Sequence, residues 1–192
     1  MHTGSNHGLI RLLGAHAAHD YFKRLAEIDH QGVVCAIFFL RKSASEYYWL
    51  NVVSDDISFS GVIEHTNLID PKEYGGRHIV YVFNYVHWDS EFFMKSAEEI
   101  IGIYKKDLLK VFPHLVPDDV LDVRLSREAF ANTIYTLNYS TEMPAHETPI
   151  EGLYLCNMSQ IYPHDRNVSN SVRLGKAVAE RILERCRAQS SD

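Results

Sequence analysis

The chain has 192 residues, 46% of them hydrophobic, and a formal net charge of -6. This is enough for the core of one domain or slightly more, and the negative charge without a basic stripe excludes a nucleic-acid-binding protein. The longest apolar run, residues 33–40, is far shorter than the roughly 20 residues that span a bilayer, and no signal sequence opens the chain. We therefore expect a cytoplasmic protein with no membrane span.

The first half of the chain predicts one helix followed by a sheet. Residues 1–8 are polar and small, and we expect a flexible lead-in over residues 1–16, to which no function is assigned. Apolar residues at helical spacing predict a helix within 17–29. Branched and aromatic runs separated by turns then predict four strands, in a sheet that we expect to be antiparallel. These strands are expected at 33–40, 47–53, 61–66 and 77–85.

The second half begins with a capping-box pattern at Ser96 and Glu99, which predicts a helix that ends at Pro113. A partly alternating strand at 120–127 and a long irregular segment at 129–147 follow. The fold class is therefore α+β, a mainly antiparallel sheet with packed helices and a C-terminal strand-helix return. The expected domains are the lead-in 1–16, an α+β substrate-binding-type domain at 17–147, and the return unit at 148–192.

The return unit is the stretch around which the functional interpretation is built. Its apolar run at 153–156 favours a buried parallel strand, and a helix is expected to open near residues 167–169. Asn or Ser there would cap the free backbone N–H groups, and an apolar stripe follows. A helix start aimed from a buried strand is suited to an anion or a polar ligand. An ordinary strand-helix pair is the alternative.

The segments PIEGLYLCN at 149–157 and SVRLGKAVA at 171–179 resemble the closing segment of the flavin-containing amine oxidase and protoporphyrinogen oxidase superfamily. In that family the segment returns the chain to the FAD domain, and the helix start meets the flavin ring. The usual Gly-Asp after the strand is replaced here by Asn157-Met158. The resemblance implies flavin contacts at Asn157, Met158, Asn167, Val168 and Ser169.

The segments 47–51, 61–67 and 74–85 are similar to the substrate-domain strands of the same family. The resemblance implies an FAD-dependent oxidoreductase, in which the flavin carries the hydride chemistry and the protein orients the substrate. A GxGxxG turn, which lets the backbone approach the pyrophosphate, occurs nowhere in the sequence. We therefore expect the dinucleotide-binding half to be missing, so that this chain alone neither holds FAD tightly nor is catalytically self-sufficient. An FAD-binding partner chain or a second copy would complete it.

Aromatic residues along the chain are candidates to line a flat, partly apolar pocket for a small-molecule substrate, with plain core packing as the alternative. The candidate substrate-binding residues are Tyr48, Trp49, Tyr81, Arg127, Tyr135 and Tyr139. No catalytic side chain is singled out.

Other chemistries have weaker support. The eleven His residues show no HxH or HExxH spacing, and no GxSxG elbow is present, so we expect neither a metal site nor a serine hydrolase. Cys35, Cys156 and Cys186 are expected to be reduced core thiols. Two alternatives to the oxidoreductase stay open. One is a non-redox flavoprotein similar to UDP-galactopyranose mutase, which an arginine pair such as Arg124 and Arg127 would favour, and the other is a non-enzymatic ligand-binding or interaction domain.

Overall fold

The computed structural model describes residues 4–189, which form two compact units. Unit 1 comprises residues 4–29 and 133–189, and unit 2 comprises His30–Asn132. The observed division differs from the expected one, because residues 17–29 and most of the segment 129–147 belong to the unit that also contains the C-terminal segment. Chain segments distant in sequence therefore build unit 1 together.

Unit 2 is built on a five-stranded sheet in the order β2-β3-β4-β1-β5. The pairs β1–β4, β3–β4 and β2–β3 are antiparallel, which confirms the α+β class with an antiparallel sheet. Three strands are longer than the sequence predicts (β1, β4 and β5) and two are shorter (β2 and β3), because strand ends depend on partners that the sequence does not reveal. The strands are β1 (His30–Leu40), β2 (Trp49–Asn51), β3 (Gly61–Glu64), β4 (His78–His87) and β5 (Val120–Thr133).

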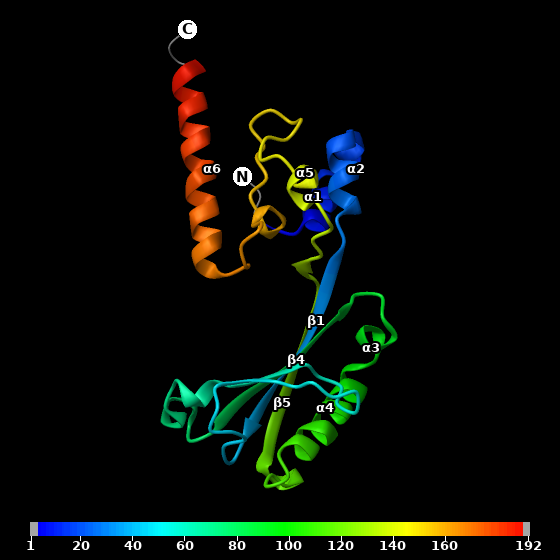
Figure 1. The fold of residues 1–192 in the computed structure, drawn as a ribbon, viewed down its shortest axis with the longest axis vertical. Coiled ribbons are helices and arrows are strands. Elements are labelled where there is room, and N and C mark those ends of the chain that lie inside the picture. The colour runs from blue at the N-terminus through cyan, green and yellow to red at the C-terminus, as the bar shows by residue number, and fades with distance from the viewer. Residues whose placement is uncertain (1–3, 190–192) are drawn as a thin grey trace. The chain divides into compact units, whose positions relative to one another are not determined.

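One face of this sheet is covered by α4 (Ala97–Val111), with the short α3 (Glu91–Met94) before it (Figure 1). The predicted capping box is confirmed: the Ser96 hydroxyl accepts from the Glu99 N–H, and the Glu99 carboxylate accepts from the Ser96 N–H. Burial alternates strictly along β1. This alternation arises because every second side chain points into the core beneath α4. The core residues include Val34, Ala36, Phe38, Val80, Val82, Ile100, Tyr104 and Leu108.

Unit 1 begins with a helix where a flexible lead-in was expected. α1 (Asn6–Leu13) is capped by Ser5, whose hydroxyl accepts from the Gly8 N–H at 3.1 Å, and Leu9 is buried. The expectation was wrong for these residues because Leu9 finds its apolar neighbours far along the chain, which composition cannot show. Residues 1–3 lie outside the described part of the chain. The other helices of unit 1 are α2 (Asp20–Glu27), α5 (Tyr139–Glu142) and α6 (Val168–Gln189).

Residues 153–156 do not form the expected parallel strand. Tyr154 forms an isolated antiparallel bridge with Glu147, and Leu155 packs in a cluster with Leu9, Phe22 and Leu25. An apolar run suits burial under helices as well as in a sheet, and here α1 and α2 cover it while its backbone pairs with residues 146–148 through the Leu155 and Thr148 N–H groups. The helix after the run does form, as α6.

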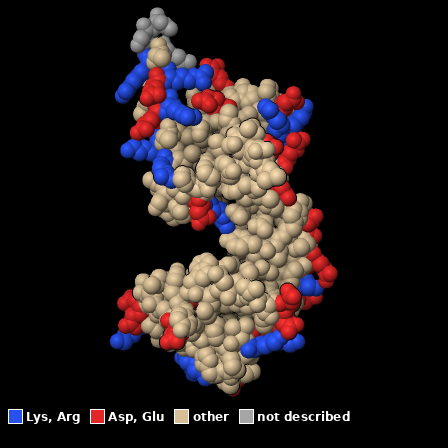
Figure 2. Space-filling view, viewed as in Figure 1, with Lys and Arg blue, Asp and Glu red and all other residues tan. Residues whose placement is uncertain are grey.

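No helix within residues 4–189 is long and apolar enough to cross a membrane. The longest, α6, carries Lys and Arg intermixed with Glu180 and Glu184 (Figure 2).

Candidate functional site

The turn that follows Leu155 is held by the side chain of Asn157. Its Oδ1 accepts from the Ser159 N–H at 3.1 Å and from the Ser159 hydroxyl at 2.6 Å. Its Nδ2 donates to Asn6 Oδ1 at 2.7 Å and to the Gly4 carbonyl at 3.0 Å. Asn157 is only 9% exposed, so its amide ties α1 to the 3-10 turn Met158–Gln160 and has no capacity left for a ligand.

Three tyrosines brace the same turn from another side. The ring centroids of Tyr135, Tyr139 and Tyr162 lie 4.8 to 5.5 Å apart. The Tyr139 hydroxyl donates to the Ser159 carbonyl at 2.7 Å, and the Tyr135 hydroxyl donates to the Ile161 carbonyl at 2.8 Å. Tyr135 and Tyr139, which the sequence nominates for substrate, therefore fix the backbone of the turn.

Burial raises the pKa of Tyr139 to about 12, helped by the neighbouring Tyr135. Because the folded pKa lies above the ordinary value of 10.0, the protonated phenol stabilises the folded state below pH 10, and this contribution is lost as the pH rises from 10 towards 12. We expect Tyr139→Phe to be less stable than the wild type at pH 8, by about 1 kcal/mol for the lost hydrogen bond, and this gap to shrink above pH 10. Urea unfolding followed by circular dichroism at 222 nm measures it. Parallel pH profiles for the two proteins would contradict the assignment.

The start of α6 is capped as the sequence predicts. Asn167 Oδ1 accepts from the Asn170 N–H at 2.8 Å, and the Asn167 carbonyl accepts from the Ser171 N–H at 3.0 Å. The N–H groups of Val168 and Ser169 have no acceptor within residues 4–189, as is usual for a first helical turn. Two polar donors and the positive end of the helix dipole therefore lie at this helix end.

A hollow of about 480 Å³ adjoins this helix start, lined by Met158, Arg166, Asn167, Val168, Ser171 and Val172. A smaller pocket of about 140 Å³ shares Met158 and Ser171 with it and also contacts Asn157. Three of the five residues nominated for flavin, namely Met158, Asn167 and Val168, thus line one hollow. Asn157 lines the adjoining pocket, and Ser169 lines neither. Met158, Val168 and Val172 make the lining mainly apolar, and Val168 is 80% exposed.

Trp49 and Tyr81 lie on one face of the unit 2 sheet. Trp49 pairs with Ile63, and Ile63 pairs with Tyr81, so all three side chains point to the same side. The alternation along β4 adds Phe83 and Tyr85, and we call Trp49, Tyr81, Phe83 and Tyr85 the aromatic face. Its rings are in contact: Trp49 lies 5.6 Å from Phe83, and Phe83 lies 5.9 Å from Tyr85.

The aromatic face is opposite α4, because the intervening residues Val80 and Val82 point into the core. Trp49 is 51% exposed, and in the view of Figure 2 much of the surface of unit 2 carries neither Lys/Arg nor Asp/Glu. His65 and Tyr74 extend it, since the His65 ring lies 6.0 Å from Tyr81 and its Nε2 is 2.7 Å from the Tyr74 hydroxyl. Sequence reasoning missed Phe83, His65 and Tyr74. The two-residue period of β4 was the signal that could have found Phe83.

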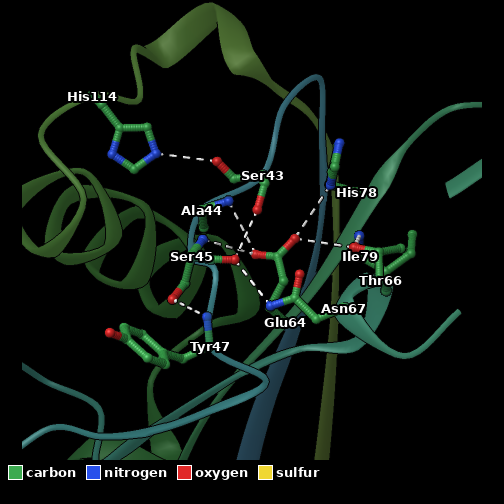
Figure 3. A network of polar contacts seen from close by, with 10 residues as sticks. All are labelled: Ser43, Ala44, Ser45, Tyr47, Glu64, Thr66, Asn67, His78, Ile79 and His114. Atoms are coloured by element: carbon green, nitrogen blue, oxygen red, sulfur yellow. Dashed lines mark hydrogen bonds and ion pairs between the residues drawn. The ribbon is translucent and has the colours of Figure 1, made fainter. Parts of the chain in front are cut away.

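Tyr48 follows a loop, residues 43–47, that a buried carboxylate organises (Figure 3). Glu64 is fully buried, and its Oε2 accepts from the N–H groups of Ala44 at 3.0 Å and Ser45 at 3.3 Å. Its Oε1 accepts from the Thr66 hydroxyl at 3.0 Å and lies 3.4 Å from His78 Nδ1. Four polar groups therefore converge on one carboxylate in the interior of unit 2.

The loop itself is tied at further points. Asn67 Nδ2 donates to the Ser45 carbonyl at 3.0 Å, the Tyr47 N–H donates to Ser45 Oγ at 3.0 Å, and His114 Nε2 contacts the Ser43 carbonyl at 3.1 Å (Figure 3). The Glu64 N–H also donates to the Tyr48 carbonyl at 2.9 Å. Tyr48 and Trp49 are thus exposed aromatics on a fixed backbone. The sequence signal that was missed is the position of Glu64 on β3. It lies two residues after the buried Val62, so its side chain points to the same, inward side of the strand.

Arg127 lies apart from these aromatics. It is on β5 at one edge of the sheet, whereas Trp49 is on β2 at the other. Its guanidinium donates to the carbonyls of Phe93 and Lys95, each at 2.7 Å. Arg124 is paired with Asp122 at 3.0 Å. Both arginines of the anticipated pair are therefore engaged within unit 2.

Within the described residues no group of three or more His, Cys, Asp or Glu is placed to hold a metal ion. Cys35, Cys156 and Cys186 form no disulfide within the described residues, and burial raises the pKa of Cys35 to about 11. Cys156 is buried and Cys35 partly buried, but Cys186 is exposed on α6, so the expectation of a core thiol was wrong for Cys186.

No protein-family profile matches the sequence, and no curated protein matches it. Solved structures do match. A candidate protoporphyrinogen oxidase from Exiguobacterium sp. 255-15 superposes with a TM-score of 0.67 at 14% identity, over 93% of this chain and 40% of that one. An oxidoreductase from Methanosarcina mazei superposes with a TM-score of 0.59 at 22% identity, over 88% of this chain and 37% of that one. What they share is the fold.

Reduced UDP-galactopyranose mutase has a more distant likeness, with a TM-score of 0.52 at 10% identity over 66% of this chain and 27% of that one. This chain therefore spans at most 40% of the length of these three proteins. The shared fold agrees with the expected α+β class, whereas the expected C-terminal strand-helix return is not confirmed. The larger part of each solved protein has no counterpart in this chain.

Proposed function

We propose that this chain is the substrate-binding and flavin-facing portion of an FAD-dependent, amine oxidase-like oxidoreductase, without the GxGxxG half that binds the dinucleotide. The observation that carries the proposal is the mainly apolar hollow at the start of α6, where Val168, whose N–H group has no acceptor within residues 4–189, meets Met158 and Asn167, two further residues nominated for flavin. The shared fold supports it, since two of the matched proteins are named as an oxidase or an oxidoreductase.

The polar and apolar groups at the hollow match those that the edge of a flavin ring would require. The Val168 N–H group and the helix dipole suit the pyrimidine edge, which gains negative charge on reduction, and Met158 and Val172 suit the flat ring. Ser169 does not line the hollow, and its N–H group is a second donor at the same helix end. The ADP half of FAD has no Gly-rich seat in this sequence, so a partner chain or another part of a longer polypeptide would bind it. When bound, the flavin would supply hydride chemistry, while this chain holds the ring edge and the substrate.

The aromatic face and the fixed loop before it would hold the substrate. Tyr48, Trp49 and Tyr81 are the residues that we assign to this role. Trp49 and Tyr81 are partly exposed on one face of a rigid sheet, and Tyr48 is partly exposed in the loop directly before β2. Tyr135 and Tyr139 act by positioning the turn at Met158, and Arg127 acts by holding the backbone at the junction of α3 and α4. A cytoplasmic location and a small-molecule substrate complete the proposal.

The mutase-like alternative has less support. It calls for an arginine pair that is available to a sugar nucleotide, whereas Arg124 is paired with Asp122 and Arg127 is bound to two carbonyls. The ligand-binding alternative predicts that no FAD-binding partner exists. An adjacent open reading frame encoding a GxGxxG domain would exclude it.

Replacing Val168 with proline removes one backbone donor at the helix start, where proline is otherwise well tolerated. Val168→Ala keeps the donor and is the matched control. After reconstitution with an FAD-binding partner chain, we expect the two-electron reduction potential of Val168→Pro to be lower than that of Val168→Ala by about 6–20 mV, corresponding to roughly 0.3–1 kcal/mol of lost stabilisation of the reduced ring. Equal potentials in the two variants would remove α6 from the flavin site.

A further inference from the structure

Unit 1 contains a second cavity, of about 540 Å³, between α2 and the segment 134–145. None of its lining residues lines the hollow at the start of α6 or the pocket beside it. Its volume lies within the range of about 300–1,000 Å³ that is usual for small-molecule sites. It is therefore a separate candidate site, independent of the proposed function.

The inner surface of this cavity is apolar and aromatic. Leu25 and Tyr139 are buried and line it, together with Ile28, Ile134 and Met143. The Tyr21 hydroxyl donates to the Ala145 carbonyl at 2.6 Å, which links α2 to the opposite wall. The two walls are thus connected, and tyrosine side chains contribute to both.

The charge around the cavity is negative. Three carboxylates, Glu27, Asp29 and Glu142, line it against one guanidinium, Arg24. The Thr136 hydroxyl donates to Glu142 Oε2 at 2.8 Å and so orients that carboxylate. α2 ends at Glu27, so the negative end of its dipole lies at the same place.

We infer that this cavity binds a small organic cation, a substituted ammonium ion with an apolar body. The carboxylates and the helix end disfavour an anion, and the apolar interior accommodates a hydrocarbon body that a metal ion lacks. Aromatic side chains combined with carboxylates are the surroundings in which quaternary ammonium groups are held, and Tyr21 and Tyr139 both line this cavity. The ligand class that we infer is therefore an alkyl- or arylammonium ion.

The test is a titration of the full chain with benzyltrimethylammonium, followed by the amide resonances of residues 134–145 in ¹⁵N–¹H spectra. Benzyl alcohol and benzoate serve as neutral and anionic probes of similar shape. We expect saturable shifts at Ile134, Thr136 and Met143 with the ammonium ion, and at least twofold weaker binding of the other two probes.

Glu27→Gln and Glu142→Gln are each expected to weaken ammonium binding about two- to fivefold, the range for one ion pair at an exposed rim. Glu151→Gln, an exposed glutamate of unit 1 outside the cavity, is expected to leave binding unchanged. Glu27 makes no side-chain hydrogen bond within the described residues, so its variant keeps the inference testable if Glu142→Gln unfolds. No saturable shift at the cavity amides would overturn the inference, as would equal binding of benzyl alcohol or an unchanged affinity in folded Glu27→Gln.

Discussion

Replacing Glu64 with alanine is expected to lower the free energy of unfolding of unit 2 by about 3–5 kcal/mol, because it leaves the N–H groups of Ala44 and Ser45 and the Thr66 hydroxyl without their buried acceptor. Both tryptophans of the chain, Trp49 and Trp88, lie in unit 2. Urea unfolding followed by tryptophan fluorescence therefore reports on this unit.

The matched control is Glu46→Ala, which removes an exposed glutamate from the loop that Glu64 anchors. We expect Glu46→Ala to change the stability by less than about 0.5 kcal/mol. Glu64→Gln, which keeps one acceptor oxygen, should fall between the two. Equal stabilities of the Glu64→Ala and Glu46→Ala variants would contradict the role of the buried carboxylate.

Leu155→Ala is expected to destabilise unit 1 by about 2–5 kcal/mol, because the fully buried Leu155 packs against α1 and α2 and a cavity would remain. Native-state hydrogen exchange at the amides of α2 measures the free energy of opening. Leu137→Ala is the control, since Leu137 is 91% exposed in the same unit. Unchanged exchange at α2 in Leu155→Ala would mean that the C-terminal segment does not support the N-terminal helices.

The sheet of unit 2 and the helix that covers it could be predicted from the sequence because their signals are local. Glu99 lies three residues after Ser96, and this spacing alone identifies the start of α4. The apolar run of β1 and the branched and aromatic residues of β4 similarly favour strands wherever their partners lie.

Unit 1 was harder to predict because its core joins residues far apart in the sequence. Leu9 and Leu155 are 146 positions apart and share one cluster. A pattern within either segment gives no sign of the other, so α1 was taken for a flexible lead-in and residues 153–156 for a strand. A short apolar run is expected both in a segment that helices cover and in a strand that is buried on both faces of a sheet, so the run alone does not distinguish the two.

The sequence predicted where the candidate site lies better than it predicted what each residue does there. The resemblance directed attention to Met158, Asn167 and Val168, which line one hollow. Asn157 was nominated as a contact, but its amide is committed to Asn6, Gly4 and Ser159. Hydrogen-bond partners distant in sequence decide such roles. The role of Glu64 depends likewise on the N–H groups of Ala44 and Ser45, about 20 positions earlier in the chain.

The central claim, that the start of α6 meets a flavin ring, is tested most directly by titrating the isolated chain with FMN, which keeps the ring and lacks the adenine. Backbone amide shifts in ¹⁵N–¹H spectra follow the titration. We expect the largest shifts at Val168 and Ser169, with smaller ones at Met158 and Asn167, and weaker shifts in Val168→Pro than in Val168→Ala. The absence of shifts at these residues up to the solubility limit of FMN, or shifts confined to another part of the chain, would contradict the flavin-facing role.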